Sequence, residues 1–207
     1  MPNPRIAVID YGIGNLRSAE KSLQRVGADA VLTNDPDVIA AAHAVVLPGV
    51  GNFGRCMQAL DQAGLTGAAI DAANDKRPFL GICVGMQMLF EGSDESPDQP
   101  GLGVLPGRVV LLPDDVKRPQ MQWNPITSSA SHPLTEPLVG QWMYFVHSYA
   151  VIDTPAALAT CDYGGPMVAA AGGDHIVATQ FHPEKSGQAG LGFLRSFVEQ
   201  IPTGVPT

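Results

Sequence analysis

The chain has 207 residues, of which 45% are hydrophobic and 15% are charged, so apolar burial can offset the entropy of ordering and a disordered chain is excluded. Its formal net charge of −8 disfavours binding to nucleic-acid backbones or to anionic membrane surfaces. No apolar stretch approaches the roughly 20 residues of a membrane-spanning helix, and no basic segment leads into an apolar one at the N-terminus, so we expect a cytoplasmic protein.

Strands and helices alternate through the first 90 residues. Short apolar runs that end in glycine or proline turns are each followed by an amphipathic stretch. Strands are predicted at residues 5–10, 28–32, 44–47 and 79–82. Helices are predicted at residues 16–26, at a short segment capped within 33–35, over a stretch that runs to about residue 74, and at 84–90. This alternation predicts a parallel sheet covered by helices on both faces.

The pattern changes after residue 91. Residues 91–101 are polar and rich in proline, and short strands without intervening helices are predicted at 107–112, 122–126, 141–151, 157–161 and 167–171. A strand at 176–180 and an amphipathic helix at 190–200 close the chain. We find no linker and therefore expect one domain over residues 1–207. Its fold class is α/β, a three-layer doubly wound and mostly parallel sheet with antiparallel additions.

The most informative motif places Cys83 between Gly81 and Gly85, where a buried strand meets a helix. A strand-to-helix elbow strains the backbone at a nucleophile, the glycines remove side chains that would clash, and the helix N-terminus favours a thiolate. The alternative is a small apolar residue at a strand end, since free cysteines are commonly buried. Taken alone, the motif leaves both interpretations open. Cys56 and Cys161 are interpreted as core residues, and three widely spaced cysteines predict neither a disulfide framework nor a CxxC metal site.

A thiolate nucleophile needs a base and a group that orients the base, and His182 with Glu184 follows the last predicted strand. In an extended chain this spacing points both side chains to the same side. A metal pair is disfavoured, because no third and fourth ligand has suitable spacing. Structural roles are the better interpretation for the remaining histidines, which are His43, His132, His147 and His175.

A second glycine-rich loop, residues 48–52, leaves the third strand and can turn backbone N–H groups inward as an oxyanion pocket. An ordinary turn is the alternative. Gly12 and Gly14 are reminiscent of a dinucleotide fingerprint, but Arg17 stands where the third glycine belongs, so that interpretation is rejected.

Together, the cysteine elbow, His182-Pro183-Glu184 and Pro48 to Gly51 resemble the class I (triad) glutamine amidotransferases. More particular runs resemble the glutaminase subunits of imidazole glycerol phosphate synthase. These runs are DYGIGNL (10–16), PGVGNF (48–53), GMQ (85–87) with LFE (89–91), WN (123–124), YFVHSY (144–149) and QFHPEK (180–185).

This resemblance implies that L-glutamine is hydrolysed to glutamate and ammonia by Cys83, His182 and Glu184, with no metal or organic cofactor. It further implies that the ammonia passes to a (β/α)8 cyclase subunit, in a heterodimer that makes imidazole glycerol phosphate and AICAR in histidine biosynthesis. The oxyanion would be bound by the N–H of Val84 and by one from Val50 or Gly51. The implied substrate contacts are Gly49, Gly51, Gln87, Glu95, Ser148 and Tyr149.

The resemblance also places Asn15, Trp123, Tyr144 and Lys185 near the partner interface, with core packing as the alternative for Trp123. It implies low activity for the isolated subunit, because the oxyanion strand of this family is often misaligned until the partner site is filled. The chain departs from the family where His-Met-Gly usually precedes Trp-Asn, since Gln120 and Gln122 replace the histidine and the glycine. The added bulk and the lost freedom at positive φ predict an interface loop that is either shaped differently or tuned to a matching partner.

Two alternatives stay open. A glutaminase for another acceptor, such as pyridoxal phosphate synthase, would be expected to show Gly-Gly-Glu-Ser in place of residues 49–52. A non-catalytic regulatory subunit of the same fold is disfavoured by the intact Cys83, His182 and Glu184.

Overall fold

The computed structural model describes residues 3–202, which form a nine-stranded mixed sheet and a small three-stranded one. The strands are β1 (Arg5–Ile9), β2 (Asp29–Thr33), β3 (Ala44–Gly49), β4 (Phe79–Cys83), β5 (Gly92–Ser93), β6 (Arg108–Leu111), β7 (Gln120–Ser129), β8 (Trp142–His147), β9 (Tyr149–Ala150), β10 (Ala157–Asp162), β11 (Pro166–Gly172) and β12 (Ile176–Thr179). The α-helices are α1 (Leu16–Arg25), α2 (Pro36–Ala40), α3 (Phe53–Gln62), α4 (Thr66–Asn74), α5 (Val84–Met88) and α6 (Gly187–Glu199). Two 3-10 helices, η1 (Glu136–Leu138) and η2 (Pro183–Lys185), complete the described elements.

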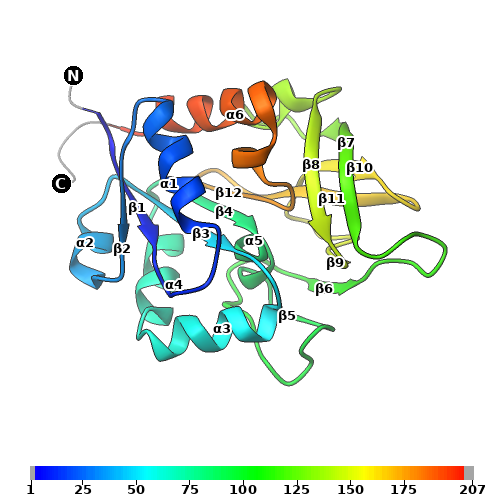
Figure 1. Cartoon of the computed structure of the whole chain (residues 1–207), viewed down its shortest axis with the longest axis horizontal. Helices are drawn as coiled ribbons and strands as arrows, with labels where there is room; N and C mark the ends of the chain where they lie inside the picture. Colours follow the sequence, from blue (N-terminus) through cyan, green and yellow to red (C-terminus); the bar gives the residue numbers. More distant parts are fainter. Residues whose placement is uncertain (1–2, 203–207) are drawn as a thin grey trace.

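The large sheet has the order β2-β1-β3-β4-β12-β11-β10-β7-β8. The first five strands in this order are parallel. Every residue of β3, β4 and β12 is buried, as expected for strands covered on both faces. Helices α1 and α6 lie on one side of this half of the sheet and α3 and α4 on the other, as Figure 1 shows. The predicted α/β class with helices in two outer layers is confirmed.

The other four strands continue the same sheet in antiparallel fashion, from β11 through β10 and β7 to β8 at the edge. No α-helix interrupts the described chain between β5 and β12, as the sequence predicted. The small sheet, β5-β6-β9, lies beside this half and brings the polar 91–101 region close to the end of β8.

Several predicted boundaries are corrected by the structure. The single helical stretch ending near residue 74 is two helices, because Gly64 adopts a φ of +71° that ends α3 and turns the chain into α4. The predicted strand 141–151 is divided at Ser148 into β8, which pairs with β7, and β9, which pairs with β6. Strand β7 is longer than predicted because it pairs with β8 along its first half and with β10 along its second.

The topology places three chain segments at one edge of the sheet. Strands β3, β4 and β12 are neighbours, and Gly49 is in register with Cys83 at their carboxyl ends. His182 follows the end of β12 on the other side of β4. Open α/β sheets bind ligands in the crevice outside the carboxyl ends of their strands, so the site is expected here. Within residues 3–202, no helix is long and apolar enough to cross a membrane.

Candidate active site

Cys83 ends β4 and directly precedes α5. Its backbone φ is +55°, the one positive value at a non-glycine residue among residues 3–202. A residue held in such a conformation costs about 1–3 kcal/mol and persists only where its surroundings impose it. The strained strand-to-helix elbow predicted from the sequence is therefore present.

The glycines around the elbow have specific packing reasons. A Cβ on Gly85 would lie 1.9 Å from the carbonyl oxygen of Leu47, and a Cβ on Gly49 would lie 2.6 Å from the backbone nitrogen of Gly85. Gly81 is less constrained, since a Cβ there would meet Ala178 and Met86 at 3.1 Å. The end of β3 and the start of α5 thus approach backbone to backbone, and this brings residues 48–51 next to Cys83.

His182 and Glu184 are joined by a hydrogen bond, in which Nδ1 of the imidazole donates to Oε1 of the carboxylate at 2.8 Å. Both side chains are almost completely buried, with 2% of each exposed. An extended chain was predicted to point both side chains to the same side, but Glu184 lies in η2, and this 3-10 turn brings the two groups together. The hydroxyl of Ser186 donates to the carbonyl of His182 at 2.6 Å and fixes this turn.

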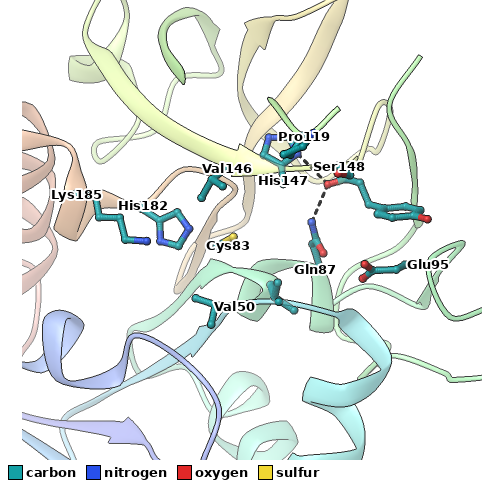
Figure 2. A pocket seen from close by; sticks show the side chains of 13 residues that line it. Val50, Cys83, Gln87, Glu95, Pro119, Val146, His147, Ser148, His182 and Lys185 are labelled. Carbon is teal, nitrogen blue, oxygen red and sulfur yellow. Dashed lines mark hydrogen bonds between the residues drawn. The ribbon is translucent and has the colours of Figure 1, made fainter. Parts of the chain in front are cut away.

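The electrostatics of His182 suit a general base next to a thiol. Burial by itself lowers the pKa of His182, but the neighbouring Cys83 sulfur and the Glu184 carboxylate outweigh burial and raise the pKa to about 9. In Figure 2 the sulfur of Cys83 lies between the imidazole of His182 and the amide of Gln87, above Val50. The three predicted catalytic residues are therefore assembled at one place.

A cavity of about 290 Å³ opens in front of Cys83. Its lining contains every predicted catalytic, oxyanion and substrate residue except Gly49 and Glu184: it comprises Val50, Gly51, Cys83, Val84, Gln87, Glu95, Pro119, Val146, His147, Ser148, Tyr149, His182 and Lys185. Gly49 packs behind the lining against Gly85, and Glu184 lies behind His182. Within residues 3–202, no group of three or more His, Cys, Asp or Glu side chains is arranged to hold a metal ion.

Two polar side chains of the cavity are held in place by the backbone. Gln87 donates from Nε2 to the carbonyl of Tyr149 at 2.8 Å and to Oε1 of Gln180 at 3.0 Å. Glu95 accepts the backbone N–H of Phe53 on Oε2 at 2.7 Å, which ties the loop after β5 to the start of α3. A fixed amide and a fixed carboxylate on one side of a cysteine match the amide and ammonium groups of an amino-acid substrate.

Comparison with known proteins identifies the family to which this arrangement belongs. Residues 7–201 match the family model of glutamine amidotransferase class-I. The chain belongs to the class-I glutamine amidotransferase family. It is 49% identical over 197 residues to the imidazole glycerol phosphate synthase subunit HisH of Methanothermobacter thermautotrophicus, covering 95% of this chain and 98% of that protein. It is also 49% identical to the HisH subunit of Dechloromonas aromatica, covering 95% and 97% of the two chains.

Solved structures share the fold of this amidotransferase at low sequence identity. The structure of PurLQS from Thermotoga maritima matches with a TM-score of 0.73 and 17% identity, covering 97% of this chain and 100% of that one. A solved glutamine amidotransferase matches with a TM-score of 0.71 and 18% identity, covering 92% and 98%.

The four predicted interface residues have different surroundings in this amidotransferase. Trp123 is 45% exposed and packs edge-on against Tyr144 at a ring separation of 6.0 Å, which excludes the alternative of core packing. Lys185 is exposed and lines the cavity. Asn15 is half-buried at the start of α1, where its Oδ1 accepts the hydroxyl of Ser18 at 2.7 Å.

The two glutamines that depart from the family pattern lie at the beginning of β7. Gln120 is fully buried, and its Oε1 has no hydrogen-bond partner. Gln122 is exposed and donates to Oδ1 of Asn124, which also accepts from Nε2 of Gln120 at 3.3 Å. The strand continues regularly through both positions and pairs with β8.

Two polar residues of the site were not predicted. Gln180 is fully buried and donates from Nε2 to the sulfur of Cys83 at 3.8 Å. His147 lines the cavity, donates from Nδ1 to the carbonyl of Tyr149 at 3.0 Å and leaves Nε2 without a partner. Burial lowers the pKa of His147 to about 4, so its ring is neutral beside the charged His182. Both residues lie in runs that carried the family resemblance, and that placement was the available signal.

Proposed function

We propose that Cys83, His182 and Glu184 hydrolyse L-glutamine in this chain, which is the glutaminase subunit of an imidazole glycerol phosphate synthase. The observation that carries the proposal is the strained Cys83 at the cavity floor with a buried imidazole–carboxylate pair beside it. A nucleophile, a base and a group that orients the base form the constellation that acyl transfer requires. We further propose that one domain, residues 1–207, holds the whole site.

In the first half of the reaction, the sulfur of Cys83, with its proton transferred to Nε2 of His182, attacks the carboxamide carbon. The hydrogen bond to Glu184 leaves Nε2 of His182 free to accept that proton and stabilises the imidazolium that forms. The oxyanion receives hydrogen bonds from the N–H of Val84 and from the residue 49–51 backbone. His182 then returns the proton to the nitrogen as the carbon–nitrogen bond breaks, which releases ammonia and leaves a thioester.

In the second half, a water molecule attacks the thioester carbon while His182 accepts its proton. The tetrahedral intermediate collapses with the carbon–sulfur bond broken and the proton delivered to sulfur, which yields glutamate and restores Cys83. We propose that Glu95 binds the α-ammonium of glutamine and that Gln87, Gly49, Gly51 and the Ser148–Tyr149 backbone position the rest of the substrate.

We propose that the ammonia passes to a (β/α)8 cyclase subunit that docks on the β7–β8 hairpin. Cross-strand register places Met121, Trp123 and Trp142 on one face of the hairpin, where 62%, 45% and 57% of these residues are exposed. Exposed apolar groups of this size mark protein interaction surfaces, and tryptophan is a frequent anchor. Tyr144 lies on the same face, and Lys185 is exposed at the cavity. Docking here would shield ammonia from water as it leaves.

A single variant tests the proposed function in the complex with the cyclase. Cys83→Ala is expected to abolish glutamine-dependent synthesis while ammonia-dependent synthesis stays at the wild-type rate, because the nucleophile serves glutamine hydrolysis alone. Cys161→Ala, which removes another buried thiol from β10, is the matched control and is expected to leave both rates unchanged. Loss of both activities, or of neither, in Cys83→Ala contradicts the assignment.

A further inference from the structure

Two buried side chains outside the catalytic triad donate hydrogen bonds to the backbone at the end of β3 and directly after it. The hydroxyl of Tyr11 donates to the carbonyl of Pro48 at 2.7 Å. The thiol of Cys56, on α3, donates to the carbonyl of Val50 at 3.3 Å. Cys56 is completely buried and Tyr11 is 5% exposed, so water does not compete for either bond. Neither side chain lines the cavity or has a role in the hydrolysis derived above.

Both groups stay protonated and can therefore donate a hydrogen bond. Burial raises the pKa of the Cys56 thiol and the pKa of the Tyr11 hydroxyl well above their ordinary values, so each keeps its proton at neutral pH. A neutral thiol is a weak donor, but a bond formed in a water-free interior is worth more than the same bond at the surface.

The two hydrogen bonds hold alternate peptide groups of residues 48–51, which we call the oxyanion segment. In a trans peptide the C=O and the N–H point in opposite directions. Because the carbonyl of Val50 points to Cys56, the N–H of Gly51 points away from it, and Gly51 lines the cavity. The Gly49–Val50 peptide lies between the peptide held by Tyr11 and the one held by Cys56. Gly51 itself has a φ of +85°, a conformation that glycine adopts without strain.

We propose that Cys56 is a positioning residue for glutamine hydrolysis: its thiol holds the Val50–Gly51 peptide so that the oxyanion segment presents N–H groups to the cavity, with Tyr11 as the second anchor. The proposal rests on the proposed function. Without the thiol, the segment samples orientations in which those N–H groups point elsewhere. The cost falls on kcat, because the negative charge on oxygen develops only in the transition state and the tetrahedral intermediate, whereas Gln87 and Glu95 still bind the ground-state substrate.

Three cysteine variants separate positioning from simple core packing. In the complex with the cyclase, Cys56→Ala is expected to lower kcat for glutamine hydrolysis by about two- to tenfold, the value of one ordinary hydrogen bond, with KM changed less than twofold. Cys56→Ser keeps a donor of nearly the same size and is expected to recover most of the loss. Cys161→Ala removes an equally buried thiol far along the sheet and is expected to leave kcat unchanged.

Tyr11→Phe, which deletes only the hydroxyl that donates to Pro48, provides a second variant should Cys56→Ala fold poorly, and it is expected to lower kcat in the same way. The proposal is overturned if both Cys56→Ala and Tyr11→Phe retain wild-type kcat, if Cys56→Ser is as slow as Cys56→Ala, or if Cys161→Ala shows the same loss. Its failure is distinct from failure of the proposed function, which would appear as glutamine hydrolysis by Cys83→Ala.

Discussion

Because β3 and α5 approach each other closely at Gly85, even the small substitution Gly85→Ala should lower both stability and kcat. In Gly85→Ala the new methyl carbon would lie 1.9 Å from the carbonyl oxygen of Leu47 and 2.8 Å from its carbon. Real Cβ contacts essentially never fall below 3.0 Å, so the strand and the helix must separate by roughly 1 Å. Both contacting atoms belong to backbone in the middle of a buried sheet, and no flexible side chain can absorb the shift.

Overpacking of a rigid interior costs typically about 1–3 kcal/mol, and the helical preference of alanine over glycine returns about 0.5–1 kcal/mol. We therefore expect Gly85→Ala to lower the free energy of unfolding by roughly 1–2 kcal/mol, which is about 2–8 °C in melting temperature for a chain of this size. The same shift moves the N–H of Val84 away from the oxyanion position proposed above, so kcat should fall more than tenfold.

Gly67→Ala is the matched control. Gly67 also lies in a helix, is exposed and has nothing within 4 Å of the point that an alanine methyl group would occupy, so alanine there should be neutral or stabilising by up to about 1 kcal/mol. Denaturant unfolding of the subunit and glutaminase kinetics of the complex measure the two effects. Equal stability and equal kcat for Gly85→Ala and the wild type would refute the packing argument.

Three further predictions concern the triad and the face of the β7–β8 hairpin that is proposed to bind the cyclase. Glu184→Gln removes the carboxylate that stabilises the imidazolium, and steady-state kinetics should show kcat lower by about 10²-fold; an unchanged kcat would remove Glu184 from the triad. Because the pKa of His182 is raised to about 9, its protonated form stabilises the fold fully below about pH 6.5, and this stabilisation is lost as the pH rises through about 9. The difference in unfolding free energy between the wild type and His182→Asn should therefore shrink from pH 6 to pH 9. A difference that stays constant contradicts the ion pair. Trp123→Ala should weaken binding to the cyclase at least about tenfold by calorimetry while leaving the melting temperature of the subunit unchanged, and unaltered affinity would contradict docking on the hairpin.

The features that the sequence predicted well are those encoded within a few residues. Gly-x-Cys-x-Gly after an apolar run specifies an elbow locally, because the strain at Cys83 and the space at Gly85 are properties of one turn. The alternation of buried strands and amphipathic helices likewise follows from local periodicity and predicted the parallel half of the sheet.

The features that it predicted poorly depend on partners distant in the chain. Ser148 interrupts a continuous strand pattern because β8 pairs with β7 whereas β9 pairs with β6, and no pattern within residues 141–151 contains that choice. Glu184 reaches His182 through a 3-10 turn that Ser186 stabilises, so the correct pairing was predicted from the wrong local geometry.

The same limit explains the site residues that were missed. Cys56 was interpreted as core, and its burial bears this out, but its hydrogen bond to Val50 arises from the way α3 folds back under the preceding loop. Gln180 is one residue beyond β12, and only the neighbouring position of β4 brings its amide to Cys83. A single sequence identifies these residue types without showing what they contact.

The most direct test of the central claim is to find the residue that glutamine acylates. The subunit, assembled with the cyclase, is incubated with a glutamine analogue that carries a chloromethyl ketone in place of the side-chain amide. The attacking thiolate displaces chloride and forms a stable thioether, and the modified residue is mapped by peptide mass spectrometry. We predict one adduct per chain, on Cys83, formed in step with the loss of glutaminase activity and suppressed by excess glutamine, with Cys56 and Cys161 unmodified. Complete inactivation with Cys83 unmodified, or an adduct on another residue that tracks the loss of activity, would contradict the account.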